Sequence, residues 1–317
     1  MIKIQYTLRK TNRKDNGMKD FKDTLLTMLT PILWGSTYMI TAVWIPIDRP
    51  IFVALMRGLP IGLILLLCYR TFPKGIWLFR SILLGSLNIG IFFLLLFIAA
   101  YRLPGGIASI IGSVQPVFII LLSWLILKEK PTTKSYLAIG MIMVGVFLLF
   151  FKQQAAIDPI GVLAALTGSA LMSLGVVLTK HWGKPEGVSQ MAFTSWQLFF
   201  GSLILIPAFL LFEGPVPPLS GANILGIAFI AIFNTGLAYF LWFRGIEKIG
   251  PAKASFLNPL NPLTAFFLGY LMLGQTINFL QVLGVIIIIS SVFVSQSKGK
   301  VKRSAAAGSG QPQNSFQ

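Results

Sequence analysis

Long apolar runs restrict this chain more than any other feature of its sequence. A helix of about 20 apolar residues crosses the roughly 30 Å hydrocarbon core of a bilayer, and the runs here have that length. The chain is 55% hydrophobic and 11% charged, whereas a soluble domain is about 25% charged. The runs are apolar on every side, unlike the alternating strands of a membrane barrel. We therefore expect an all-α membrane protein.

Turn residues divide the apolar sequence into ten predicted membrane spans. Short segments that contain Pro, Gly or charged residues separate the spans, as at 46–50 and 214–218. The predicted spans are residues 24–46, 50–69, 76–100, 104–127, 133–151, 157–180, 189–212, 221–243, 250–273 and 276–296.

A stretch of the fourth predicted span recurs in the ninth. Residues 104–127 read PGGIASIIGSVQPVFIILLSWLIL, and residues 251–273 read PAKASFLNPLNPLTAFFLGYLML. Paired helices interrupted by Pro and Gly in this way point to the substrate site of a membrane transporter. The matching pairs, 146 positions apart without a gap, are Ala108-Ser109 with Ala254-Ser255 and Gln115-Pro116 with Asn261-Pro262.

The positions of Lys and Arg predict the orientation of the spans. Of the 26 basic residues, 22 fall on the side that holds both termini, three fall on the opposite side, and Arg57 lies within the second span. Cytoplasmic loops carry the excess of Lys and Arg, so we expect both termini in the cytoplasm. Each half has five spans, an odd number, and the second half is therefore inverted relative to the first. The predicted fold is ten transmembrane helices in two inverted five-helix repeats.

This count gives four predicted segments. Residues 1–23 form a basic cytoplasmic tail, without the apolar core and cleavage site of a signal peptide, and Met18 is a second candidate start of translation. Residues 24–151 form the first repeat and residues 157–296 the second. Residues 297–317 form a cytoplasmic tail that we expect to be disordered.

Arg57 is a charged residue within a predicted span, where a charge costs free energy unless it has a partner. One interpretation is a binding site for an anionic or carboxylate-bearing substrate. The other is a structural Arg that ties helix ends together or reaches the outer interface. The only cysteine, Cys68, lies in an apolar run, and we expect it to be buried.

Amide and aromatic side chains within the spans are further candidates. An amide can line a cavity and bind a polar solute, or it can satisfy backbone carbonyls freed by Pro. Aromatic rings can stack on a planar ligand, whereas Trp196 and Trp242 can instead be interface anchors. The candidates for the cavity wall are Trp34, Tyr38, Arg57, Asn88, Gln115, Trp196, Gln197, Asn234, Tyr239, Asn258 and Asn261.

The nine carboxylates all fall in tails or at the ends of predicted helices. Proton-driven carriers usually place Asp, Glu or His along the pathway. We therefore expect a facilitator or a weakly coupled exporter, with Asp48, Glu129 and His181 as coupling candidates. The sequence has no metal-ligand spacing and no phosphate-binding loop, so we expect no metal, no cofactor and no enzyme activity.

Several motifs together resemble the drug/metabolite transporter superfamily, EamA branch. They are ten spans in two halves, WGSTY at residues 34–38, Arg57 in span two, Pro in spans four and nine, and Leu127-Lys128-Glu129 before span five. Local stretches such as Asp48-Arg49-Pro50 and Leu241-Trp242-Phe243-Arg244-Gly245 are similar to bacterial sequences labelled blue-pigment (indigoidine) exporters.

The resemblance implies export of small metabolites, amino acids, drug-like molecules or pigments across the bacterial inner membrane by alternating access. It also implies a central cavity walled by the candidates given above. The expected partners are a small-molecule substrate and membrane lipids, but not nucleic acid; a homodimer stays open. The alternatives are a carrier of nucleotide sugars or lipid precursors in the same fold, and a non-transporting membrane component that docks a partner.

Overall fold

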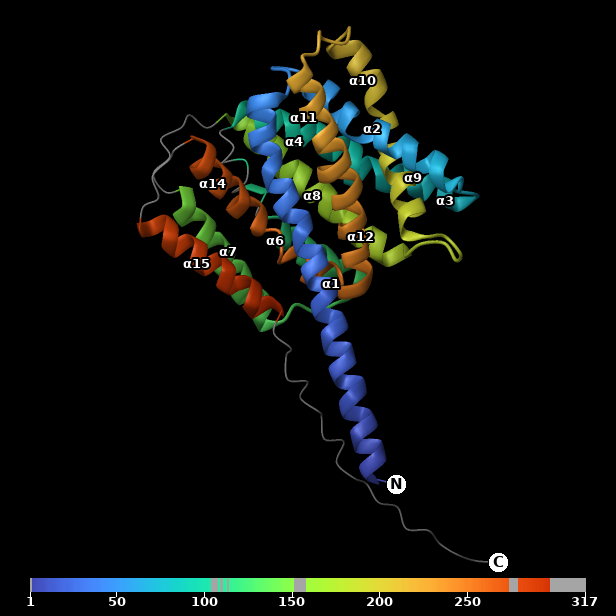
Figure 1. The fold of residues 1–317 in the computed structure, drawn as a ribbon, viewed down its shortest axis with the longest axis vertical. Coiled ribbons are helices and arrows are strands. Elements are labelled where there is room, and N and C mark those ends of the chain that lie inside the picture. The colour runs from blue at the N-terminus through green and yellow to red at the C-terminus, as the bar shows by residue number, and fades with distance from the viewer. Residues whose placement is uncertain are drawn as a thin grey trace, which may run out of the picture.

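The computed structural model describes residues 2–103, 108, 111–112, 114–150, 158–273 and 279–296. The predicted C-terminal tail and parts of spans four, five and ten lie outside the described residues. The described chain consists of helices (Figure 1): α1 (Ile2–Trp44), α2 (Pro50–Tyr69), α3 (Ile76–Gly85), η1 (Ser86–Gly90), α4 (Ile91–Arg102), α6 (Gln115–Leu127), α7 (Thr133–Phe150), α8 (Pro159–Trp182), α9 (Gln190–Leu203), α10 (Leu205–Phe212), α11 (Gly221–Ala231), η2 (Ile232–Leu237), α12 (Ala238–Ile249), α13 (Pro251–Ser255), α14 (Leu260–Leu273) and α15 (Phe279–Gln296).

Helices occupy each of the ten predicted spans, which confirms the all-α membrane fold. By length and composition, six helical segments of the described chain are able to cross a membrane. They are Phe21–Trp44, Pro50–Tyr69, Ile76–Arg102, Pro159–Trp182, Gln190–Phe212 and Gly221–Ile249. The helices at the other four predicted spans are shorter in their described parts, so the number ten stays a prediction.

The first helix begins earlier than predicted. α1 is continuous from Ile2 to Trp44, and Figure 1 shows its N-terminal part extending away from the bundle. Residues 2–16 contain no Pro or Gly, and Lys, Arg, Leu and Gln favour a helix. The boundary predicted at residue 23 marks a change of composition, and the helical backbone passes through it.

The two halves are related by a pseudo-two-fold axis, because the helix contacts stay the same when each helix is exchanged for its counterpart in the other half. α2 packs on α9, and α7 packs on α15, so each of these pairs joins corresponding helices. α4 packs on α8 as α12 packs on α1, and α6 packs on α8 as α14 packs on α1. Figure 1 shows α7 and α15 side by side at the edge of the bundle. The central helices are therefore those of spans one to four and six to nine.

Each half carries one π-helical segment at the corresponding place. η1 begins at Ser86 and η2 at Ile232, which are 146 positions apart. Asn88 of η1 therefore corresponds to Asn234 of η2. We call each of these π-helical segments a π-turn. In such a segment i→i+5 backbone hydrogen bonds replace the regular i→i+4 bonds of the helix, and segments of this kind are frequent at functional sites. The same shift relates the two Pro-bearing helices, so it holds over two consecutive spans of each half.

Proline explains two further interruptions. Pro207 has no N–H to donate to the carbonyl of Leu203, and the helix of span seven is divided at Ile204 between α9 and α10. In span nine, Pro259 falls in the turn between α13 and α14. This second break places the amide side chains of Asn258 and Asn261 between the two halves of the bundle.

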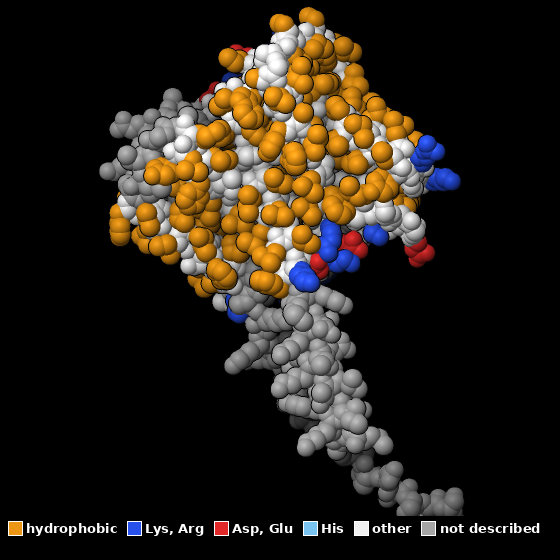
Figure 2. Space-filling view, viewed as in Figure 1, with side chains coloured by type: hydrophobic (Ala, Val, Ile, Leu, Met, Phe, Trp, Pro, Cys, Tyr) orange, Lys and Arg blue, Asp and Glu red, His pale blue; other side chains and the backbone are white. Residues whose placement is uncertain are grey.

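The surface of the bundle is apolar around its middle. Figure 2 shows hydrophobic side chains over most of the visible face, with Lys, Arg, Asp and Glu near its margins. Cys68 is exposed on this kind of surface, and the expectation that it is buried was wrong. It lies in the last turn of α2, where the neighbouring residues 67 and 69–70 are exposed as well.

Candidate substrate cavity

A cavity lies between the two halves of the bundle. Its volume is about 80 Å³, counted as space open to the centres of water molecules, and one water needs about 10–15 Å³ of such space. It therefore has room for several waters or a small solute. Its lining comes from α1, α4, α6, α8, the start of α14 and the segments before α6 and α14: Trp34, Tyr38, Phe92, Leu96, Ala99, Ala108, Gly112, Gln115, Ala164, Ala165, Gly168, Ser169, Met172, Asn258, Asn261 and Pro262.

Three carboxamides line the cavity, together with the hydroxyl-bearing side chains of Tyr38 and Ser169. Asn258 Nδ2 donates a hydrogen bond to Gln115 Oε1, across the boundary between the halves. The side-chain oxygens of Asn258 and Asn261 are buried and have no hydrogen-bond partner in the described part of the chain. Buried polar atoms of this kind cost free energy unless water or a ligand satisfies them. The amides are thus able to donate to and accept from a bound solute.

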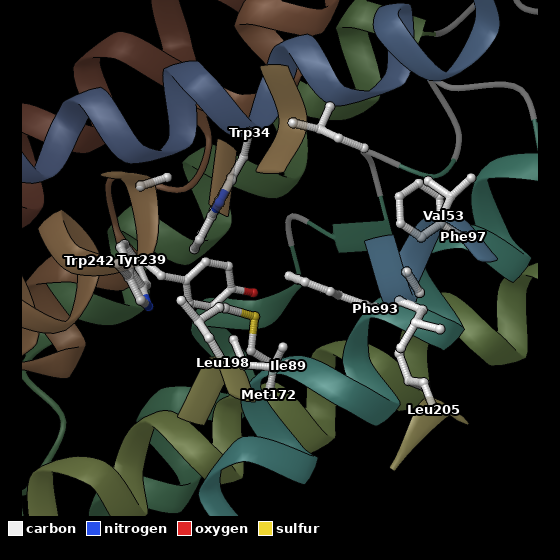
Figure 3. Packing of buried hydrophobic residues seen from close by; sticks show 14 of the residues in the cluster. Trp34, Val53, Ile89, Phe93, Phe97, Met172, Leu198, Leu205, Tyr239 and Trp242 are labelled. Atoms are coloured by element: carbon white, nitrogen blue, oxygen red, sulfur yellow. The ribbon is translucent and has the colours of Figure 1, made fainter. Parts of the chain in front are cut away.

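Aromatic, aliphatic and small side chains form the rest of the wall, and the rings of Tyr239 and Trp242 pack behind Trp34, outside the lining. Trp34 Nε1 donates to the carbonyl of Asn234 at 2.9 Å, and the Trp34 ring lies 5.3 Å from the ring of Tyr239 and 5.2 Å from that of Trp242. Figure 3 shows these rings gathered in one cluster. Gly168 of α8 is one of the small residues opposite. The rings offer a flat apolar surface.

Arg57 does not line this cavity. Its side chain is 1% exposed; Nε donates to Thr235 Oγ1 at 2.8 Å, and Nη2 donates to the carbonyl of Asn234 at 3.1 Å. The guanidinium also lies over the Phe93 ring, 4.4 Å from its centroid. These contacts give Arg57 a structural role, but they join the middle of α2 to η2 rather than two helix ends, and binding of an anionic substrate stays a prediction. The π-turn supplies the acceptors that hold the charge.

The Asn234 side chain completes this cluster. Its Nδ2 donates to Ser36 Oγ at 3.1 Å and to Thr37 Oγ1 at 3.0 Å, both in α1. Because Trp34 Nε1 and Arg57 Nη2 both donate to the Asn234 carbonyl, the π-turn connects Arg57 to a ring of the cavity wall. Arg57 is thus in a position to affect the cavity without touching a solute.

The corresponding π-turn of the first half has its own polar cluster. Asn88 Nδ2 donates to Gln197 Oε1 at 2.8 Å and to Thr179 Oγ1 at 3.3 Å. Asn88 and Gln197 are fully buried and lie outside the lining of the cavity. Tyr239 Oη donates to the carbonyl of Asn88 at 3.1 Å. The structure therefore brings the candidate amides together in two groups, one in the cavity and one at the π-turns.

Trp196 and Trp242 are buried, at 1% and 0% exposure. Trp196 Nε1 donates to the carbonyl of Thr71, in the connection between α2 and α3. Trp242 belongs to the ring cluster around Trp34. Neither ring is thus on the outer surface, where an interface anchor would lie.

The coupling candidates Asp48, Glu129 and His181 are exposed and lie outside the cavity lining. Asp48 is in the connection between α1 and α2, Glu129 follows α6, and His181 is in the last turn of α8. Among the described residues that line the cavity, none carries a charged side chain. Any proton transfer at the candidate residues would therefore occur at the ends of the bundle.

Sequence reasoning missed several of these residues. Thr179 and Thr235 were not candidates, although both belong to the polar clusters at the π-turns. The shared signal was present: residues 88–90 and 234–236 both read Asn-x-Gly at the 146-residue shift. The apolar wall residues of α4, such as Leu96 and Ala99, carry no sequence signal that separates them from other apolar residues.

Comparison with known proteins agrees with this architecture. The EamA-like transporter family model matches the chain twice, over residues 22–151 and 159–296. Protein PecM of Dickeya dadantii (strain 3937) is 42% identical over 280 residues, which cover 88% of this chain and 92% of that protein. The uncharacterized inner membrane transporter YedA of Escherichia coli (strain K12) is 26% identical over 269 residues, 82% of this chain and 86% of that protein.

A solved crystal structure has the same fold. It superposes with a TM-score of 0.71 at 18% sequence identity, over 87% of this chain and 96% of that one. At that identity the likeness shows the fold alone. The two matches to the family model together cover most of the chain, and the PecM relative is similar over nearly its whole length. This membrane protein therefore belongs to the EamA-like transporter family.

Proposed function

We propose that this transporter exports small, partly planar organic molecules without net charge, such as metabolites, zwitterionic amino acids, and drug-like or pigment molecules. The observation that carries this proposal is the lining of the cavity. It combines three carboxamides with Trp34, Tyr38 and a wall of small and larger apolar residues, and none of the described lining residues is charged.

The chemistry of the lining supports this class of substrate. Each carboxamide offers both donors and acceptors, so Gln115, Asn258 and Asn261 together match a solute edge that carries carbonyl and N–H or O–H groups. The ring of Trp34 is suited to cover a flat apolar face. A net anion would lose its hydration without gaining a cationic partner, which costs free energy. Phosphate-bearing substrates therefore fit this lining poorly.

The direction of transport, the membrane and the transport cycle are inferred from features other than the cavity lining. The relative named as an inner membrane transporter supports a place in the inner membrane, and the resemblance to bacterial exporters favours export as the direction. The exchange of corresponding helices between the halves supports alternating access, with one half rocking against the other around the cavity. The uncharged lining favours facilitation or weak coupling over a strongly proton-driven cycle.

A flux screen tests the proposal. Purified protein in proteoliposomes is offered labelled amino acids, planar pigments and nucleotide sugars, with and without a pH gradient. We expect saturable flux of net-neutral planar solutes, with less than about a tenfold effect of the gradient, the size of a 1.4 kcal/mol coupling. Preference for phosphate-bearing solutes would contradict the substrate class, and absence of flux for every solute would favour a non-transporting role.

A further inference from the structure

The 146-residue shift assigns a counterpart to each cavity residue of spans three and four. Gln115 corresponds to Asn261, and Gly112 corresponds to Asn258. Both members of each pair line the same cavity. Residues that meet their own counterparts lie close to the pseudo-two-fold axis. This part of the cavity therefore stays within the substrate path whichever half of the transporter is open.

Other lining residues have counterparts outside the cavity. Phe92, Leu96 and Ala99 lie on one face of α4 and line the cavity. Their counterparts on α12 are Ala238, Trp242 and Gly245. Ala238 and Trp242 are 0% exposed, and Gly245 is also buried.

α1 covers this face of α12. Thr30 Oγ1 donates to the carbonyl of Ala238 at 3.1 Å, and Trp34 packs on Trp242. Towards the end of α12, Arg244 Nη2 forms an ion pair with Asp23 at 2.6 Å. A hydrogen bond, ring packing and an ion pair thus hold α1 against this face of α12.

Gly245 shows how tight the contact is. A Cβ atom at this position would lie 2.4 Å from Thr27 Oγ1 and 2.5 Å from Thr27 Cγ2. Its counterpart, Ala99, carries a Cβ and lines the cavity although it is 1% exposed, whereas Phe92 and Leu96 on the same face of α4 are half-buried. Corresponding faces of α4 and α12 are thus in opposite states: one is open to the cavity, and the other is sealed by α1.

The indole N–H of Trp242 gives independent evidence that this face of α12 has a role in another state. Its Nε1 is buried and has no hydrogen-bond partner in the described part of the chain. A buried donor without a partner is costly and calls for a role in another state of the protein. A ligand acceptor that reaches this face would remove that cost.

We infer that Ala238, Trp242 and Gly245 form a second substrate subsite, which α1 closes here and which opens towards the Arg244 end of the bundle in the alternate state. Trp242 Nε1 donates there to a carbonyl or other acceptor oxygen of the same net-neutral, planar solute. The inference rests on the proposed function, and it follows from the exchange of states that an inverted repeat allows.

Thiol accessibility tests the inference. In a Cys68→Ser background, Leu96→Cys reports on the half-buried cavity face of α4 and Ala238→Cys on the sealed face of α12, with a small membrane-impermeant methanethiosulfonate added to either side of sealed vesicles. Gly245→Ala then inserts a methyl group against Thr27. We expect the Ala238→Cys reaction to become about fivefold faster and the Leu96→Cys reaction to become slower by a similar factor.

Opposite results would overturn the inference. An Ala238→Cys thiol that stays unreactive while the same vesicles show solute flux means that this face never opens. Reaction of both thiols from the same side contradicts two alternating openings. Asp23→Asn, which removes the ion pair without adding atoms, is the second variant if Gly245→Ala does not fold, and it should act in the same direction. Loss of flux in the unmutated vesicles, with reciprocal reactivity intact, would count against the proposed function alone.

Trp242→Phe tests the hydrogen bond itself. The substitution keeps an aromatic ring and removes the N–H. The KM for solutes with acceptor oxygens should rise about threefold to tenfold, the size of one hydrogen bond, while the KM for solutes without an acceptor oxygen stays as before. An unchanged KM would remove Trp242 Nε1 from the subsite.

Discussion

At the scale of single residues, Arg57 is the clearest case of a charge that the fold itself accommodates. A central Arg in a bilayer costs at least about 2.5 kcal/mol on insertion scales, and among the described residues no carboxylate forms an ion pair with Arg57. The π-turn meets this cost in part, because its Asn234 carbonyl and Thr235 hydroxyl accept from the guanidinium. Arg57 thus stabilises an irregular turn that a regular helix would not need.

Replacing Arg57 should damage transport of every solute to a similar degree. Arg57→Ala removes two buried charge-assisted hydrogen bonds, each worth about 1.5–3 kcal/mol, and frees the turn that orients Trp34. Arg57→Lys restores a charge but not the two-pronged geometry, so it should rescue only in part. Flux of carboxylated and neutral solutes in proteoliposomes checks this. Selective loss of the carboxylated solutes would show that Arg57 binds an anionic substrate.

Gly175 allows the other polar cluster to form. A Cβ on Gly175 would lie 2.3 Å from Asn88 Oδ1, so Gly175→Ala should displace the amide that bonds Gln197 and Thr179. Overpacking of this kind costs about 1–3 kcal/mol, and thermal unfolding in detergent should shift to lower temperature. Gly140→Ala is the matched control, because nothing lies within 4 Å of its Cβ position. Equal effects of the two substitutions would contradict this interpretation of the Asn88 cluster.

At the scale of helices, proline and amide positions were readable from the sequence and the π-turns were not. Pro259 and Pro262 predicted the interrupted helix of span nine, because proline cannot donate a backbone hydrogen bond. The π-turns at Asn88 and Asn234 contain no proline. They depend on tertiary contacts from α1, α2, α8 and α9, which no local pattern specifies.

The cap of α8 is an element whose contribution depends on pH. Asp158 Oδ1 accepts from the N–H groups of Ile160 and Gly161, at 2.7 and 3.3 Å, and Oδ2 accepts from Arg102 at 2.9 Å. The hydrogen bond from Arg102 is the main cause that lowers the pKa of Asp158 below its ordinary value of 3.8, and the two N–H groups add to it.

The sign of the effect follows from the lowered pKa. The stabilisation by Asp158 is present above the ordinary carboxyl pKa and is lost as the pH falls through the folded value. Asp158→Asn keeps a cap acceptor but carries no charge to lose. The difference in melting temperature between wild type and Asp158→Asn should therefore shrink as the pH falls from about 5 to about 3. A difference that stays constant over this range would show that the charge contributes nothing.

At the scale of the whole molecule, the sequence predicted the membrane class, the duplication and the family, because hydropathy and the 146-residue shift are properties of the chain alone. It also predicted one cavity wall of eleven residues, of which Trp34, Tyr38, Gln115, Asn258 and Asn261 line the cavity and the other six do not. It did not separate the three amides of the cavity from Asn88, Gln197 and Asn234, since all six amides lie in apolar runs. Their separation depends on which side of each helix faces the pseudo-two-fold axis, and packing decides that.

The central claim is that amides at the axis of an inverted repeat bind the transported solute. The most direct measurement is the KM of saturable flux in proteoliposomes for wild type, Gln115→Leu and Asn261→Leu, the two axis counterparts. The account predicts that KM rises about tenfold in both variants, the effect of about 1.4 kcal/mol of lost hydrogen bonding. It also predicts that Asn223→Ala, a change in the capping box of α11 outside the cavity lining, leaves KM unchanged. An unchanged KM in both axis variants, with flux intact, would contradict the account.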